Sequence, residues 1–456
     1  MNLLVTFSDS STKVYNRDDI KSLNIKLECD PTIATIPVCE FDAEVLDTEH
    51  NESDFRTAQV KVRDDERTSG GTLFELTCNY HIVDTSAVSN NVYYFKAQSV
   101  LAKLDNYKLS QRYYGNTRGS AIIEDIFTEC GWTGEKPYSI QSSPQWLDQD
   151  FSGLLPEQTA RERLLWVMQA GCCVVEQWGS FQWGTQTKDR LFINDAKEMS
   201  SWGYSDTWNI VCADEIFNKP VIKTVDSVNC IRYRTYDSWT DTTPYDPNDY
   251  ENFQYLIRYD PATGQPIYSY YYAMKYDHVL GSVGGKEVQI YNNNLMNELI
   301  EDAYDWMLSP YTKKYEVQLD VIDYKKSQSD GAPSRISSLL PNRFVKFALD
   351  KETFSIGVIK RVEYVIGALN RIRLTVLTTL EPVAARKCTI RCVYFDGYGR
   401  RLLASIDFSV PEGNGRLITL PDIEAYIVDR LEKFYPQIRT TFLNSDSTIL
   451  YIPSST

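Results

Sequence analysis

Histidines, cysteines and clustered carboxylates are the residues of this chain that could do chemistry. The three histidines, His50, His81 and His278, lie far apart in the sequence, in polar surroundings and without a recognisable partner motif. The sequence carries no serine-hydrolase, zinc-protease or nucleotide-binding signature. Residues 281–286 come nearest to a phosphate-binding loop, but no Ser or Thr follows Lys286, so a turn is the favoured interpretation.

The ten cysteines are spread along the chain without a CxxC pair and without histidines at metal-ligand spacing. Cys388 and Cys392 would share one face of a strand, but too far apart along it for an easy disulfide. Cys172 and Cys173 receive the same interpretation. We therefore expect free, buried thiols and no zinc site.

Two acidic clusters, at residues 64–66 and 246–251, are the densest groups of carboxylates. A pair of carboxylates at a defined separation could hydrolyse a glycosidic bond. The second cluster could also hold calcium through side-chain oxygens, yet it lacks the ligand spacing of an EF-hand loop. Both clusters stand in polar, loop-like sequence, where a solvated charge run is the simpler explanation. We predict no catalytic residue, no metal ligand and no cofactor, and hence a protein that is not an enzyme.

Length and charge restrict the class of protein further. A chain of 456 residues exceeds one hydrophobic core and predicts roughly two to four domains. Its 31 Tyr and 9 Trp favour strands and contact surfaces. The net charge of −15 repels phosphate backbones and anionic lipids, so direct nucleic-acid binding is not expected. The sequence shows neither a signal peptide nor a stretch of membrane-spanning length, so we expect synthesis in the cytosol.

The first part of the chain predicts short strands. Ile20, Leu23 and Ile25 have the spacing of a half-buried strand, and Pro37 precedes the next one. Residues 59–63 and 73–78 alternate in polarity on either side of a glycine turn at 69–71. A further strand at 93–97 leads into a turn or short helix. This pattern predicts a small β-barrel or sandwich over residues 1–112.

Residues 113–215 predict an α+β insertion. Ser120 is a plausible N-cap for a helix over 121–130, and Gly131 suits its C′ position. A second helix is predicted from Pro156 to Gly171, with residues 161–163 on its polar side. Strands at 172–176 and 181–183 follow, joined by a turn at 178–180.

Strands dominate again in residues 216–384, at 315–321, 343–347, 355–362 and 371–377, with one helix after Asn294. Residues 381–386 predict a short linker that contains Pro382. Beyond it, residues 387–456 predict a β-grasp-like module: a hairpin around 396–399, a helix opened by Pro421 and a closing strand at 448–452. The fold class is therefore β-rich α+β with several domains.

The order of these features resembles the structural hub proteins of phage tail tips and baseplates, and of related injection machines. The resemblance is carried by an opening strand pair at 14–25 and 36–42, by a step at 340–345, and by Tyr113-Tyr114-Gly115, Cys130-Gly131-Trp132, Thr159-Ala160-Arg161-Glu162-Arg163-Leu164-Leu165 and Trp178-Gly179-Ser180-Phe181. It extends to about Pro382.

The resemblance implies a building block of a virion. By it, 1–112 and 216–384 each hold a hub barrel, and three subunits form a homotrimeric ring that imitates a six-fold tail tube. The partners would be a tail-tube or distal tail protein and the tail-tip or receptor-binding proteins, with DNA passing through the lumen during ejection. The protein would be assembled in the host cytoplasm and reside in the virion, at the tail tip.

Two other functions stay open on the sequence. A receptor- or carbohydrate-binding adhesin would use a crowd of tyrosines between residues 239 and 288, a segment that matches no feature of the resembled family. A tail-associated peptidoglycan hydrolase is less favoured, because no histidine-based motif is present. If the adhesin is right, host surface glycans would stack on an interaction surface made of Tyr245, Tyr250, Tyr255, Tyr268, Tyr270, Tyr271 and Tyr272.

Overall fold

The structure is a computed structural model of the whole chain. The residues that it describes are 2–31, 35–69, 72–134, 136–140, 147, 150–155, 157–171, 173–178, 181–182, 185–186, 191–195, 210–225, 227–235, 254–257, 285–292, 314–322, 339–366, 371–395, 401–412, 416–419 and 449–452.

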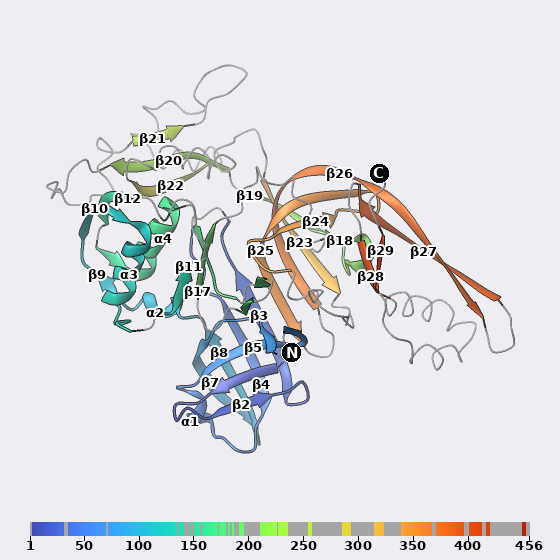
Figure 1. Cartoon of the computed structure of the whole chain (residues 1–456), viewed down its shortest axis with the longest axis horizontal. Helices are drawn as coiled ribbons and strands as arrows, with labels where there is room; N and C mark the ends of the chain where they lie inside the picture. Colours follow the sequence, from blue (N-terminus) through green and yellow to red (C-terminus); the bar gives the residue numbers. More distant parts are fainter. Residues whose placement is uncertain are drawn as a thin grey trace.

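The N-terminal part is an antiparallel array of strands with one short helix, drawn in blue in Figure 1. The alternation at Ile20, Leu23 and Ile25 is confirmed, because all three side chains are buried in one strand. On either side of the predicted turn at 69–71, β5 and β6 pair with Ser69 opposite Thr72, while residues 70 and 71 lie outside the described residues. The elements are β1 (Asn2–Thr6), β2 (Thr12–Tyr15), β3 (Ile20–Glu28), β4 (Glu40–Leu46), α1 (Glu52–Phe55), β5 (Gln59–Ser69), β6 (Thr72–Glu75), β7 (Tyr80–Ser89) and β8 (Val92–Gln98).

The second half supplies a further group of strands, drawn in green to orange. They are β18 (Ile210–Val211), the 3-10 helix η3 (Ala213–Glu215), β19 (Val221–Val225), β23 (Lys314–Ile322), β24 (Phe344–Ala348), β25 (Thr353–Ile366), β26 (Arg371–Phe395) and β27 (Arg401–Pro411). Four of these match the strands predicted over 315–377.

The two groups form one sheet. Strand β3 pairs with β25 from Leu27 opposite Val362 to Leu23 opposite Ile366, which links residues far apart in the sequence. The strand order β19-β23-β26-β25-β3-β4-β8-β7-β5-β1-β2 belongs to a single sheet of 15 strands. One hydrophobic core extends from Leu3 to Val376 beneath it. The β-rich prediction is confirmed, while closure of this sheet into barrels stays a prediction.

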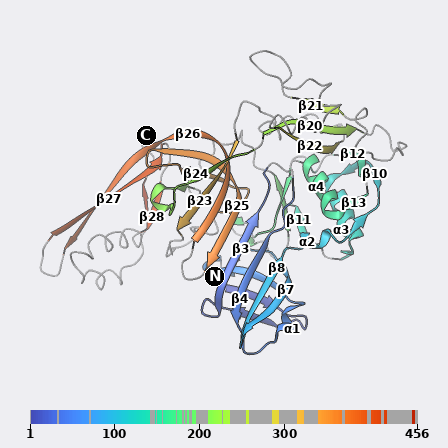
Figure 2. The ribbon, with the colours of Figure 1, turned by 180° about the vertical axis from the view of Figure 1, so that it is seen from behind.

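The predicted linker at 381–386 is wrong. These residues lie inside β26, which continues without interruption from Arg371 to Phe395. Pro382 faces Ser355 of β25 where the register of the two strands shifts. A proline lacks an N–H for the ladder, and such an irregular position is where a strand tolerates one. The far end of β26 pairs with β27, and this hairpin projects from the rest of the molecule in both ribbon views (Figures 1 and 2).

Between the two groups of strands the chain forms an α+β unit with a core of its own. Its helices α3 and α4 pack together, and α2 contacts α4. The elements are α2 (Leu101–Leu104), β9 (Lys108–Leu109), β10 (Arg112–Arg118), α3 (Gly119–Glu129), β11 (Tyr138–Ile140), β12 (Asp150–Leu155), β13 (Gln158–Thr159), α4 (Ala160–Ala170), β14 (Cys173–Glu176), β15 (Phe181–Gln182), β16 (Thr185–Gln186) and β17 (Leu191–Asp195).

The first helix of the unit, α3, ends as predicted. Gly131 adopts φ 93°, and the Trp132 N–H donates to the Phe127 carbonyl at 3.0 Å, which satisfies a carbonyl at the helix end. The helix begins one residue before the predicted cap Ser120.

The second helix, α4, begins at Ala160, so the predicted start at Pro156 is wrong. The physical reason is a capping box: the Thr159 N–H donates to Glu162 Oε2 at 2.9 Å, and the Glu162 N–H donates to Thr159 Oγ1 at 3.3 Å.

Two smaller sheets complete the described part of the chain. β20 (Ser227–Thr235), β21 (Gln254–Ile257) and β22 (Gly285–Asn292) form one, and β28 (Arg416–Thr419) pairs with β29 (Ile449–Ile452) in the other. The predicted closing strand at 448–452 is therefore confirmed. The helices predicted after Asn294 and Pro421 lie outside the described residues. Among the helices that are described, none combines the length and the apolar character that crossing a membrane requires.

Candidate functional site

The last residue of β14 and the two residues after it form a junction between three parts of the molecule. We call Glu176, Gln177 and Trp178 the central junction. All three are fully buried. The Glu176 carboxylate accepts hydrogen bonds from Asn194 Nδ2 at 3.2 Å, from Asn342 Nδ2 at 3.2 Å and from Arg343 Nη1 at 2.9 Å. One carboxylate thus ties β17 of the α+β unit to the segment before β24.

Gln177 binds the N-terminal sheet in the same way. Its Oε1 accepts from the Cys39 N–H at 2.9 Å and from the Ser99 hydroxyl, while its Nε2 donates to the Pro37 carbonyl at 2.7 Å. Its own carbonyl accepts from the Tyr80 hydroxyl at 2.9 Å. Because both ends of the amide and the backbone are engaged, this side chain has one orientation. It fixes β14 against the strands around β4, β7 and β8.

The hairpin predicted between residues 172–176 and 181–183, with a turn at 178–180, is not the pairing that the structure shows. The side chain of Trp178 is among the largest that are fully buried, and its backbone pairs with Thr77, so Trp178 is not the tip of a turn. The partner of β14 is β17, with Val175 opposite Ile193, rather than the strand at 181–183. The nearer strand β15 pairs with β16 instead. The sequence signal for the junction was a polar pair directly after an apolar strand, followed by a tryptophan.

A second candidate lies at one end of the large sheet. Strand β19 pairs with β23, and among the described strands β23 is its only partner. Four of its five residues are exposed, including Val221 and Ile222, and Phe217 just before it is exposed as well. An edge with unpaired backbone groups and apolar side chains is suited to pairing with another chain.

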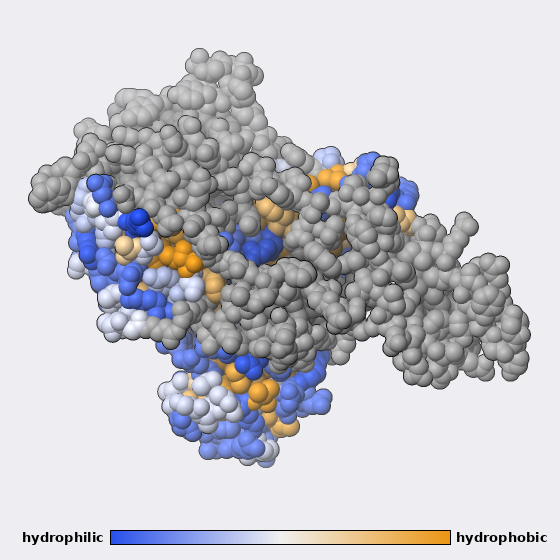
Figure 3. All heavy atoms as spheres, in the orientation of Figure 1, coloured by the Kyte–Doolittle hydropathy of each residue, from blue (hydrophilic) through white to orange (hydrophobic). Residues whose placement is uncertain are grey.

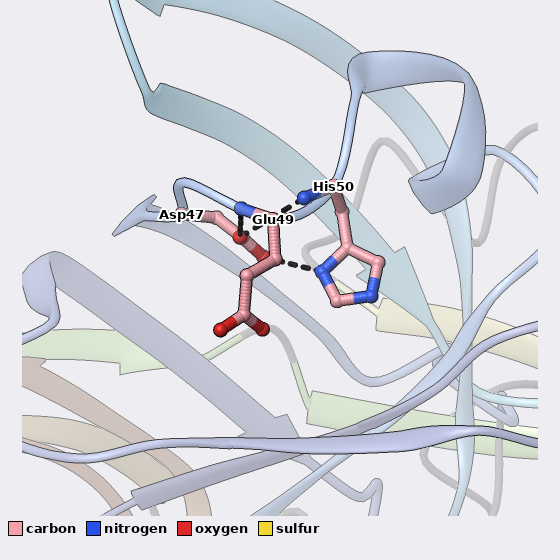
Figure 4. Close-up of side chains that lie close together, drawn as sticks. All are labelled: Asp47, Glu49 and His50. Atoms are coloured by element: carbon pink, nitrogen blue, oxygen red, sulfur yellow. Dashed lines mark hydrogen bonds and ion pairs between the residues drawn. The ribbon is translucent and has the colours of Figure 1, made fainter.

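The third candidate is a cluster of Asp47, Glu49 and His50, whose ligand-type atoms lie within 4.8 Å of one another (Figure 4). The Asp47 carboxylate is buried and accepts five hydrogen bonds. Oδ1 accepts from Lys13 Nζ at 2.9 Å and from the N–H groups of Glu49 and His50; Oδ2 accepts from the Tyr15 hydroxyl and lies 2.9 Å from His50 Nδ1.

This cluster is built as an internal ion pair rather than as a metal centre. The Lys13 ammonium also bonds Glu49 Oε2 at 2.9 Å, so a cation of the protein itself already pairs with both carboxylates. Burial alone would raise the pKa of Asp47, but the hydrogen bonds from Tyr15, Glu49, Lys13 and His50 hold it well below its usual range. The cluster connects the loop after β4 to β2. The sequence shows no recognisable partner for His50, because Asp47 precedes it without forming a known motif.

The other residues singled out in the sequence are only partly covered by the structure. Residues 64–66 form part of β5, while 246–251 and His278 lie outside the described residues. Tyr255 belongs to β21. The remaining tyrosines of the predicted interaction surface, Tyr245, Tyr250, Tyr268, Tyr270, Tyr271 and Tyr272, lie outside the described residues. The glycan-binding surface therefore stays a prediction.

This chain is similar to known proteins in structure but not in sequence. No family model matches the sequence, and no curated protein matches it either. The structure is similar to the 43 kDa tail protein of prophage MuSo2 from Shewanella oneidensis, with 9% identity, a TM-score of 0.47 and coverage of 84% of this chain and 100% of the other.

Two further solved structures are similar to this chain. A tail protein from Neisseria meningitidis MC58 has 11% identity and a TM-score of 0.49, covering 82% of this chain and 96% of the other. A type VI secretion component from E. coli has 9% identity and a TM-score of 0.39, covering 88% of each chain.

Proposed function

We propose that this protein is a structural hub of a phage tail tip or baseplate, in which three copies form a ring that connects the tail tube to the tip components. The observation that carries the proposal is the edge strand β19. It ends a sheet that is otherwise held on one continuous core, and it presents Val221 and Ile222 to solvent. A ring needs a surface that meets a different surface of the next copy, and an open sheet edge supplies one half of such a contact.

The central junction supports a mechanical role. The parts of a hub must keep fixed positions relative to one another between the tube and the tip. Here a buried carboxylate and a buried amide hold three parts of the chain together. Buried polar groups whose partners are all in place restrict a core to one arrangement. Tail-complex partners of the kind named above fit such a rigid body better than a hinged one.

The test is the mass of the protein in solution. We expect native mass spectrometry to show a trimer of the full chain. A double variant, Val221→Lys with Ile222→Lys, should shift the population to monomers, because charged side chains on an edge oppose strand pairing. The matched control is Val83→Lys on β7, since Val83 is exposed to 53% and Val221 to 51%. A full-length monomer at micromolar concentration would contradict the hub.

A further inference from the structure

A cavity of about 290 Å³ opens where the N-terminal sheet meets the α+β unit. Its wall combines β5 and β7 with α2, the residues after α3 and the start of β17. The side chains that matter here are Gln59, Asn79, His81, Lys103, Trp132 and Leu191. None of the lining residues belongs to β19, to the central junction or to the Asp47 cluster, although the N–H of the lining residue Cys78 donates to the Gln177 carbonyl at 3.4 Å.

One side of the cavity carries a positive charge. Lys103 Nζ lies 3.2 Å from His81 Nδ1. An ammonium can only donate, so the imidazole accepts and is neutral. Burial, and then the charge of Lys103, lower the pKa of His81 to about 4. The described residues that line the cavity include one ammonium and no carboxylate. Burial also lowers the pKa of Lys103, which is the effect expected of an ammonium without a nearby anion.

The wall also has an apolar part, which is held in place. Trp132 is half-buried, and its ring meets Phe127 edge-on, with 5.6 Å between the centroids. Tyr107 lies 6.2 Å from the same ring. Leu191 is fully buried beside it. An indole fixed by aromatic neighbours offers a flat surface to a guest at little entropic cost. The amides of Gln59 and Asn79 can donate to oxygen atoms at the rim.

We propose that this cavity binds a carboxylate attached to an apolar group of side-chain size. The Lys103 ammonium pairs with the carboxylate, His81 keeps the ammonium in position, and Trp132 packs against the apolar group. Ligand pockets usually combine an apolar or aromatic wall with a few charged and polar groups that orient the ligand, as this cavity does. Such a ligand can come from neighbouring acidic and aromatic side chains of a partner protein, or from a free organic acid. The inference does not depend on the hub proposal.

The test uses two probes, N-acetyl-Asp-Phe-amide and phenylacetate, with binding to the full chain measured by isothermal titration calorimetry. We expect saturable binding of at least one of them. Replacing Asp by Asn in the peptide should weaken its binding at least tenfold, because the amide has the same shape without the charge. A preference for the peptide identifies a partner's side chains as the ligand, and a preference for phenylacetate identifies a free acid.

Two protein variants distinguish binding in the cavity from a general effect of positive charge on the protein. Lys103→Gln should weaken the binding probe at least tenfold. Lys108→Gln is the control, because Lys108 is exposed and pairs with Glu157 away from the cavity. Lys103 is itself exposed, so its loss should leave folding intact, which circular dichroism checks. The proposal is overturned if neither probe saturates, if the Asp and Asn peptides bind alike, or if Lys103→Gln binds as the unchanged protein does.

Discussion

At the scale of single residues, Asp47 is a charged side chain held inside the protein by many hydrogen bonds. Five donors converge on a carboxylate that has no contact with solvent. The neighbouring ring of His50 stacks on Phe7, with 4.0 Å between the centroids. The cluster therefore joins a polar network to the aromatic part of the core. Its role is to hold the loop after β4 in place.

We expect Asp47→Asn to destabilise the N-terminal sheet by about 2 to 4 kcal/mol. An amide cannot accept from all five donors, so the ammonium of Lys13 would lose its buried partner. Calorimetric unfolding at pH 7 would measure the effect. Asp18→Asn provides the control, because Asp18 is exposed on the turn before β3. Equal unfolding temperatures for the two variants would contradict the role given to Asp47.

The same residue predicts a dependence on pH. The pKa of Asp47 is lowered in the folded state, so the unfolded chain takes up a proton first as the pH falls. The stabilisation is fully present above the ordinary aspartate pKa of about 4 and is lost progressively below it. The Asp47→Asn variant should therefore lose less stability than the unchanged protein between pH 5 and pH 3. Parallel loss in both would show that Asp47 does not titrate as stated.

Arg163 shows why the sequence could not give the environment of every residue. The helical pattern placed it on the polar side of its helix, yet its side chain is fully buried. Its Nη2 donates to the carbonyls of Leu109 and Ser110, and Nη1 lies 4.0 Å from Glu129. These acceptors stand more than 30 residues away in the chain. Helical spacing identifies faces, but it does not show which distant groups a charged side chain will meet.

At the scale of elements, the sequence predicted what local patterns determine. The strand with buried Ile20 and Ile25, the pairing of β5 with β6 and the end of α3 at Gly131 all follow from spacing and backbone preference. The errors concern pairing. The partner of β14 lies beyond β15 and β16, and the continuity of β26 through Pro382 depends on its neighbours β25 and β27. Both depend on contacts that no local pattern contains.

The buried face of α4 gives the prediction at this scale. Leu164 is buried in the core of the α+β unit, with Val167 and Met168 on the same side. Leu164→Asp would bury a carboxylate without a partner and should cost about 3 kcal/mol or more. Ala121→Asp in the first turn of α3 is the control, because Ala121 is exposed and an acidic residue there suits the helix dipole. Differential scanning calorimetry should show a lower unfolding temperature for the first variant only.

At the scale of the whole molecule, the strands within residues 1–112 and those within residues 216–384 share one core. Residues from β1 to β8 and from β23 to β26 share it, and the central junction adds Trp178. Figure 3 shows a described surface that is largely hydrophilic, with hydrophobic patches on the N-terminal sheet and beside the α+β unit. Partial unfolding of the N-terminal strands alone would expose the buried face of β3 and β25. We therefore expect the shared sheet to unfold as one unit.

The shared core also determines what the C-terminal part contributes. Within the part of the chain that the structure describes, its buried residues end at Val376 and Leu380 is partly buried against it, although β26 continues to Phe395. Val410 of β27 is fully buried, and the other contacts of β27 and of the far part of β26 with this region lie at the surface. The Ser409 hydroxyl donates to the Lys351 carbonyl at 2.7 Å, and Lys387 pairs with Glu352 at 3.0 Å between two exposed side chains. Exposed ion pairs of this kind contribute little to stability, about 0 to 1 kcal/mol.

A chain that ends at Ala385 should therefore fold and still form trimers. The cut passes through β26 and removes the buried Val410, but the pairing of Thr353 with Ala384 and the core from Leu3 to Val376 remain. Native mass spectrometry of this truncated chain measures the trimer, and calorimetry measures its stability. Attachment to tip components should weaken, because the projecting hairpin of β26 and β27 is gone. Monomers with an unchanged unfolding temperature would place the subunit contact in residues 386–456 and would remove β19 as its site.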